Sequence, residues 1–169
     1  MVASLGMQFD FHGIGVGKRM SNETFEKLMH KKRTRYGTEV CYADNSRKVF
    51  EQYHNNTPCA YMLLSDQSPN DINKCYWIDF LNRKTAFIYG CEYFAKKYNY
   101  PVFYYNVKKI KRGYYEFEIS EISTKPQETE YGFIVEKSAK ILENTLKQTP
   151  QYWLWSHRRW KLKYENINK

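Results

Sequence analysis

A continuous apolar run constrains the fold most. Pro58 ends the preceding segment, and residues 59–65 then read Cys-Ala-Tyr-Met-Leu-Leu-Ser without a charge. Such a run is typical of a strand that is buried on both faces, as in a parallel sheet. Segments of strand character at 38–43, 76–80 and 102–107 alternate with segments of helical periodicity. The order predicts an α/β fold with a largely parallel or mixed central sheet and flanking helices.

The expected helices cover residues 22–35, 46–53, 86–98 and 128–148. In the first of them, Phe25, Leu28 and Met29 mark the expected buried face. Glycines alternate in residues 13–17, which indicates a short strand or turn. Residues 108–113 contain four cations and a glycine, a pattern that predicts the turn of a hairpin and usually serves solubility only. A length of 169 residues favours one domain over residues 1–169.

The net charge of +9 predicts acidic partners: nucleic acid, anionic lipid or a phosphorylated substrate. No run approaches the roughly 18 apolar residues that span a bilayer, and no cleaved leader is visible. The four cysteines, Cys41, Cys59, Cys75 and Cys91, form no Cys-x-x-Cys pair, so we expect no metal site and free thiols in a reducing cytoplasm.

The richest motif lies near the C-terminus, in residues 150–161, which read Pro-Gln-Tyr-Trp-Leu-Trp-Ser-His-Arg-Arg-Trp-Lys. Pro150 suits the first turn of a short helix. On that helix Trp153, Ser156, His157 and Trp160 would share one face, while Arg158 and Arg159 would point in other directions. Aromatic rings beside guanidinium groups suit a boundary where apolar surface meets phosphate or carboxylate.

This segment resembles the terminal signature of the bacterial lipid A late acyltransferases, the lauroyl and myristoyl transferases of the lysophospholipid acyltransferase superfamily. The resemblance covers most of the chain, from about residue 16 to residue 161. It implies the same α/β fold. It also implies transfer of a fatty acyl group from an acyl-carrier-protein or coenzyme A thioester to the hydroxyl of a lipid A-like or other lipid acceptor, with no cofactor besides the donor.

The resemblance also suggests binding residues. A basic residue, then Ser-Asn, then a helix that ends Arg-x-Arg-x-Gly, is similar to the family pattern and makes Lys18, Arg33 and Arg35 candidates for binding phosphate. Asp66 and Gln67 match an Asp-Gln of the family. They follow a predicted strand, at the strand end where ligands gather in α/β sheets. Arg158 and Arg159 complete the candidate set. Asn82 stands where the family carries glycine, which is tolerable if the backbone there needs a positive φ.

The family's catalytic pair, a histidine followed by Asp or Glu five positions later, is not found. The histidines are His12, His30, His54 and His157, and the residues five positions after them are Gly17, Arg35, Cys59 and Leu162. We therefore expect no catalytic residue, and a chain that is inactive alone, as the C-terminal part of an acyltransferase whose N-terminal part is missing. His157 is a poor substitute, because Arg158 and Arg159 disfavour its charged form.

Two other functions remain open: a basic nucleic-acid-binding module, and a membrane-surface module that binds lipid without catalysis. No nucleic-acid-binding signature is present, so nucleic acid is not the expected partner. The expected partners are the lipid acceptor and the acyl carrier, with peripheral membrane contact at the cytoplasmic face of the inner membrane. A sheet edge left open by a missing part would favour a homodimer, unless residues 1–17 cover it.

Overall fold

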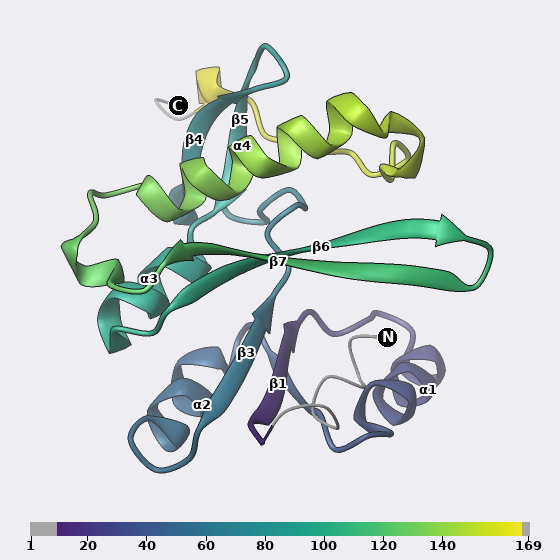
Figure 1. Ribbon diagram of the computed structural model, residues 1–169, viewed down its shortest axis with the longest axis vertical. Coiled ribbons are helices and arrows are strands. Elements are labelled where there is room, and N and C mark those ends of the chain that lie inside the picture. Colours follow the sequence, from purple (N-terminus) through teal and green to yellow (C-terminus); the bar gives the residue numbers. More distant parts are fainter. Residues whose placement is uncertain (1–9, 167–169) are drawn as a thin grey trace. The chain divides into compact units, whose positions relative to one another are not determined.

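The computed structural model describes residues 10–166, and the chain divides after Leu64 into two compact units (Figure 1). Unit 1 holds a parallel sheet with two helices, and unit 2 holds two antiparallel strand pairs with two helices. This confirms the predicted α/β class, although the strands form three separate sheets rather than one. The single domain over residues 1–169 stays a prediction.

The sheet of unit 1 has the order β2-β1-β3, with β2 at Glu39–Tyr42, β1 at His12–Gly17 and β3 at Cys59–Leu63. Both pairings are parallel. The segment expected to be a short strand or turn is therefore the middle strand. Residues 1–9, part of the segment 1–17 considered as an alternative cover for a sheet edge, lie outside the described residues.

One face of this sheet is buried by α2 (Ser46–Tyr53). Ile14, Cys41 and Val49 form the core between them, and the ring of Phe50 stacks on Tyr61 with 3.9 Å between centroids. Because side chains alternate along a strand, the other face of β1 presents Gly13, Gly15 and Gly17. That face offers little apolar surface to a second helix.

Helix α1 (Glu23–Thr34) begins where expected, since the Asn22 side chain accepts a hydrogen bond from the Phe25 N–H at 2.9 Å. Its predicted buried face is wrong, because no residue of α1 is buried, and Phe25 and Leu28 are 47% and 48% exposed. The glycines of β1 give a physical reason: the middle strand contributes no side chain to that face against which the apolar stripe could be buried.

Unit 2 contains β4 (Cys75–Phe80), β5 (Arg83–Ile88), α3 (Gly90–Tyr98), β6 (Val102–Lys111), β7 (Tyr114–Ser123) and α4 (Phe133–Gln148). Strands β4 and β5 pair antiparallel, as do β6 and β7, so the predicted hairpin is confirmed. Residues 86–88 were predicted to be helical but belong to β5. The segment expected as helix 128–148 becomes helix α4 only from Phe133, after a short 3-10 turn at Pro126–Glu128.

A two-residue turn explains how β5 was missed. Leu81 and Asn82 join β4 to β5 with φ values of 51° and 59°. Positive φ at both central residues is the geometry that matches the twist of a tight hairpin. Asn82 thus has the positive φ that makes asparagine a tolerable replacement for glycine, whereas a leucine at such a position gives no sequence signal for a turn.

The core of unit 2 lies between α4 and the strand pair β4–β5. Val135, Ala139, Leu142 and Leu146 of α4 pack with Phe80 and Phe87, and a second cluster joins Ala95, Val102, Ile122 and Ile134. Helix α4 therefore buries one face, which includes Ile134, Val135 and Leu142.

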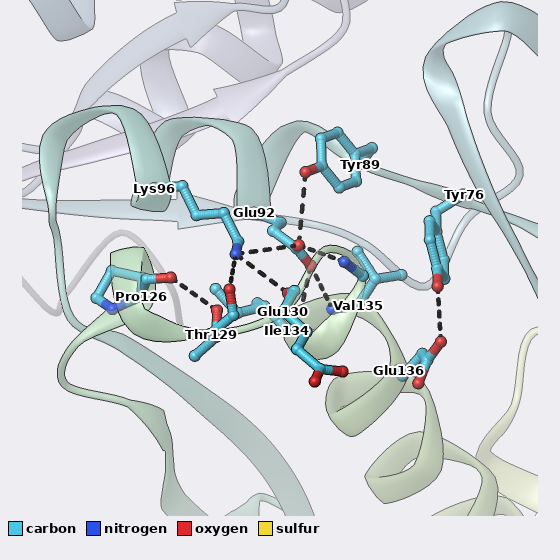
Figure 2. A network of polar contacts seen from close by, with 11 residues as sticks. Tyr76, Tyr89, Glu92, Lys96, Pro126, Thr129, Glu130, Ile134, Val135 and Glu136 are labelled. Carbon is cyan, nitrogen blue, oxygen red and sulfur yellow. Dashed lines mark hydrogen bonds and ion pairs between the residues drawn. The ribbon is translucent and has the colours of Figure 1, made fainter.

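Helix α4 begins on a buried carboxylate, that of Glu92 in α3 (Figure 2). Glu92 is 0% exposed and accepts hydrogen bonds from the N–H groups of Gly132 (2.6 Å), Ile134 (3.1 Å) and Val135 (3.2 Å). N–H groups at a helix start have no partner within the helix, and a negative charge there also complements the helix dipole. Lys96 lies 4.0 Å from Glu92 and donates to the carbonyls of Thr129 and Glu130.

The C-terminal segment does not form the predicted helix. Only Pro150–Tyr152 are helical, as a 3-10 turn, and a series of turns follows. The reason lies in two side-chain anchors: Arg159 Nη1 donates to the Ala86 carbonyl at 2.7 Å, and Trp160 Nε1 donates to Thr85 Oγ1 at 2.9 Å. In a helix, neighbouring side chains diverge by about 100°, so two successive residues could not both reach β5.

Candidate functional site

A small hollow in unit 2 brings together two segments that the sequence singled out separately. It is lined by Asp66 and Gln67, which follow β3 in the chain, and by Trp153, Leu154 and His157 of the C-terminal segment. Trp153 also packs on the core beneath. The segments that carry the family resemblance are thus neighbours in space, as expected for parts of one site.

His157 fastens the two segments together. Its Nε2 accepts a hydrogen bond from the Ser68 N–H at 3.0 Å, and Ser68 itself is buried. A ring nitrogen that accepts carries no proton, so the neutral imidazole carries its proton on Nδ1. His157 therefore offers a donor at Nδ1, while its basic nitrogen is already engaged by the backbone.

Arg159 lies inside unit 2 and is 2% exposed, so the structure does not present it as a surface cation. Besides its bond to the Ala86 carbonyl, its guanidinium lies 4.2 Å from the centroid of the Phe87 ring. Its Nε and Nη2 have no hydrogen-bond partner among residues 10–166. Burial lowers the pKa of Arg159 to about 10, and the charge of Asp66 opposes that shift. Arg158, in contrast, is exposed.

Asp66 also acts on two tyrosines of β6. Burial, with the charge of Asp66 as the next cause, raises the pKa of Tyr104 to about 12 and raises that of Tyr105. Asp66 therefore lies in a neighbourhood that contains one buried cation, Arg159, and two phenols that stay protonated near neutral pH.

In unit 1, charged residues gather at the carboxyl ends of β1 and β2. Tyr42 donates to Glu26 Oε1 at 2.5 Å, and the Arg19 guanidinium lies 3.9 Å from the centre of the Tyr42 ring. The hydrogen bonds from Tyr42 and from the Met20 N–H hold the pKa of Glu26 below its usual value, with the Arg33 charge contributing. Lys18 directly follows β1 and is exposed.

Of the three predicted phosphate-binding residues in unit 1, Arg33 approaches β1, because a Cβ added to Gly17 would lie 4.0 Å from its Nη1. Lys18 and Arg33 therefore lie at the same end of the sheet. Arg35 follows α1, and its guanidinium lies 5.3 Å from the centre of the neighbouring Tyr36 ring. The phosphate-binding roles of Lys18, Arg33, Arg35, Arg158 and Arg159 stay predictions.

One histidine does pair with a carboxylate. His12 Nε2 lies 2.9 Å from Glu39 Oε2, which also accepts a hydrogen bond from the Tyr53 hydroxyl at 2.7 Å. Although burial favours protonation of Glu39, these two hydrogen bonds lower its pKa. The pair lies at the amino ends of β1 and β2, and ligands of α/β sheets gather at the opposite ends. We interpret these hydrogen bonds as structural, because through Glu39 they connect β1 and β2 to helix α2.

The cysteines are free thiols, and burial raises the pKa of each of them, that of Cys91 to about 11. A raised thiol pKa disfavours the nucleophilic thiolate. Within the described part of the chain, no group of three or more His, Cys, Asp or Glu side chains could hold a metal ion.

The sequence did not single out three members of these clusters: Arg19, Tyr42 and Ser68. Arg19 follows the predicted Lys18, and Ser68 follows Gln67, so adjacency was the available signal. Nothing in the sequence paired Tyr42 with Glu26, because that contact depends on how α1 returns to β2.

The family is decided by a comparison with models of known families. The model of the bacterial lipid A biosynthesis acyltransferases matches residues 3–162 of the 169. The chain belongs to this family. The resemblance found in the sequence is thereby confirmed, and acyl transfer is the activity that the family supports in general. A search of curated proteins finds no match. None of the described helices has the length and apolar character needed to cross a bilayer.

Proposed function

We propose that this acyltransferase-family chain takes part in moving a fatty acyl group from an acyl-carrier-protein or coenzyme A thioester to a hydroxyl of a lipid A-like glycolipid. In this proposal the chain contributes substrate-binding surface and does not contribute the catalytic base. Its partners are the lipid acceptor and the acyl carrier, and it works at the cytoplasmic face of the inner membrane.

The observation that carries the proposal is the hollow formed by Asp66, Gln67, Trp153 and His157. A carboxylate accepts hydrogen bonds from sugar hydroxyls, and the Nδ1–H of His157 donates to a carbonyl or phosphate oxygen. The indole of Trp153 adds an apolar wall. Such a mixture of one charge, one donor and one ring suits the polar headgroup of a lipid better than its acyl chain.

In unit 1, Lys18 and Arg33 at the carboxyl end of the sheet supply positive charge for an acidic group. The substrates of the proposed reaction carry such groups, because both a phosphorylated glycolipid and a phosphopantetheine carrier are anionic. Guanidinium and ammonium groups bind phosphate through charge-assisted hydrogen bonds.

Two of the four histidines, His12 and His157, are held by other groups in the structure. The Nε2 of His157 is held by the Ser68 N–H, and His12 pairs with Glu39 at the end of the sheet away from ligands. A general base must hydrogen-bond the hydroxyl that it deprotonates. Neither side chain meets that requirement, so we expect the chain alone to be inactive.

The test is acyl transfer by the purified chain, with acyl-carrier-protein and coenzyme A thioesters as donors and a phosphorylated glucosamine-disaccharide lipid as acceptor. The expected result is no acylated product above the enzyme-free background, detected by mass spectrometry. Product formation would refute the missing base, and the variants His12→Gln and His157→Gln would then show which histidine supplies it.

Binding is tested separately with a matched pair at His157. The variant His157→Gln keeps an acceptor for the Ser68 N–H, while His157→Phe leaves that buried donor unpaired. Glycolipid binding should survive better in the glutamine variant. Equal binding by both would remove His157 from the site.

A further inference from the structure

The β6–β7 hairpin is an amphipathic ribbon. Each strand has ten residues, and Figure 1 shows its turn reaching away from α3. Because paired residues share a face, one face carries the pairs Phe103–Glu121, Tyr105–Ile119, Val107–Phe117 and Lys109–Tyr115. The other face carries Tyr104–Ser120, Asn106–Glu118 and Lys108–Glu116. The first face is mainly apolar and the second mainly polar.

The apolar face is the exposed one. Phe103 is 53% exposed and Ile119 is 61% exposed, and Val107, Phe117 and Tyr115 are between 37% and 49% exposed. On the polar face, Tyr104 packs against both cores of unit 2 at the base of the hairpin. The polar face of the ribbon therefore packs on unit 2 at its base through Tyr104. On the apolar face Tyr105 is half-buried near Asp66 and Lys109 lies 5.8 Å from the centre of the Tyr152 ring, whereas Phe103, Val107, Phe117 and Ile119 are exposed.

The turn of the hairpin combines cations with large apolar side chains. Lys109, Lys111 and Arg112 stand beside Ile110, Tyr114 and Tyr115, which are 63%, 61% and 49% exposed. The ammonium of Lys111 lies 4.3 Å from the centre of the Tyr114 ring. Lys108 is neutralised by Glu118 at 2.6 Å on the polar face, so the remaining cations belong to the end of the ribbon.

We propose that this hairpin docks the protein onto an anionic lipid surface, with the turn and the apolar face toward the lipid. Tyrosine and isoleucine side chains enter the boundary between headgroups and acyl chains, and lysine and arginine extend their charges to the lipid phosphates. The attraction of these cations to an anionic surface adds to the burial of the apolar side chains and weakens as salt is added.

The cations at the turn indicate which kind of partner the apolar face of the hairpin would bind. A second copy of the chain placed on this face would bring the same cationic turn toward a like charge. A neutral partner would leave Lys109, Lys111 and Arg112 uncompensated. An anionic bilayer satisfies both the exposed apolar area and the cations. The inference does not depend on the proposed acyl transfer, because it concerns a surface and not a reaction.

The experiment is flotation of the full chain with vesicles of phosphatidylcholine alone and with 30% phosphatidylglycerol, at low and at moderate salt. The charge variant is Lys109→Gln/Lys111→Gln, and the apolar variant is Ile110→Ser/Ile119→Ser. Lys140→Gln/Lys147→Gln on α4 is the matched charge control, and Phe133→Ser is the apolar control. Circular dichroism verifies that each variant is folded.

We expect the wild type to bind the anionic vesicles, with weaker binding to neutral vesicles and at higher salt. The charge variant should lose at least tenfold in partitioning onto anionic vesicles, and the apolar variant should lose binding to both kinds. The controls should bind like the wild type within a factor of about three.

Three results would overturn the proposal: no vesicle binding by the wild type, equal loss in hairpin and control variants, or a dimer that the apolar variant abolishes while vesicle binding is absent. The charge variant removes no buried contact, so it remains informative if the apolar variant fails to fold. Vesicle binding by a chain without acyl transfer would leave this inference standing and bear only on the proposed function.

Discussion

Unit 2 buries two ionisable side chains of opposite sign, Glu92 and Arg159, which differ in how many of their hydrogen bonds are made. Glu92 is 0% exposed, receives three backbone N–H groups and lies near Lys96. Arg159 is 2% exposed, donates to one carbonyl, and has two nitrogens with no hydrogen-bond partner in the described chain. The two groups are equally removed from water but not equally compensated.

The number of hydrogen bonds that each buried charge makes indicates whether it serves mainly the fold or mainly a site. A buried charge with all its hydrogen bonds made fixes the position of a helix, here the start of α4. A buried charge with bonds left unmade costs stability, and such groups are found where a protein needs them for a ligand or for positioning. Glu92 should therefore matter chiefly for folding, and Arg159 chiefly for the arrangement of the hollow near Asp66.

The largest effect is expected for Glu92→Ala. Three N–H groups and the charge of Lys96 would lose their partner, and breaking such a buried network costs about 3–5 kcal/mol. Urea unfolding followed by circular dichroism measures this loss. Glu92→Gln keeps one acceptor oxygen and should lose less. A loss below about 1 kcal/mol for the alanine variant would mean that Glu92 does not hold α4 in place.

Gly132 supports the same helix start and provides the next largest effect. Its φ is 89°, and an added Cβ would lie 2.2 Å from the Tyr76 ring, so Gly132→Ala combines backbone strain with a steric clash. We expect a loss of about 2 kcal/mol or more in the free energy of unfolding. Gly113→Ala is the matched control, because Gly113 has φ 82° but no atom within 4 Å of the added Cβ. Equal losses would show that the clash with Tyr76 is relieved.

Arg159→Met should have a smaller effect on stability than either change. It removes a partly unsatisfied buried charge while filling similar volume, a replacement that is often neutral or stabilising, so we expect a change within about 1 kcal/mol. Thermal unfolding at constant pH measures it. A loss as large as that of Glu92→Ala would contradict the contrast between the two buried charges.

The smallest effect concerns Tyr76, which donates to Glu136 at 2.7 Å in the first turn of α4 (Figure 2). That hydrogen bond, with burial next, raises the pKa of Tyr76 from 10 to about 12. The folded state therefore keeps the phenolic proton after the unfolded state has lost it. The stabilisation is complete below pH 10 and is lost as the pH rises toward 12. The stability difference between wild type and Tyr76→Phe should shrink over that range in urea unfolding, and a constant difference would refute the assignment.

Local signals predicted much of the fold. The helix expected over 22–35, the helix at 46–53 and the strand expected over 38–43 each depend on a few neighbouring residues, and each is found with small changes of its bounds. The family resemblance, which rests on a dense run of rare residue types, is confirmed as well.

The failures depend on contacts between distant segments. Helix α1 has the expected apolar stripe, but whether the stripe is buried was decided by the glycines of β1. The C-terminal segment has a plausible helical pattern, yet Arg159 and Trp160 both bond to β5 and force turns. For the site, the sequence named Asp66 and Gln67, but the contact between His157 and the Ser68 N–H could only come from the structure.

The central claim is that the chain binds the polar part of an acidic lipid substrate through the hollow around Asp66. Trp153 lines that hollow, so its fluorescence can follow a titration with a phosphorylated, acylated glucosamine disaccharide. The account predicts saturable binding by the wild type, a dissociation constant at least about tenfold higher in Asp66→Asn because a charged acceptor is lost, and no change in Lys140→Gln. Identical titration curves for wild type and Asp66→Asn, or no saturation at all, would contradict it.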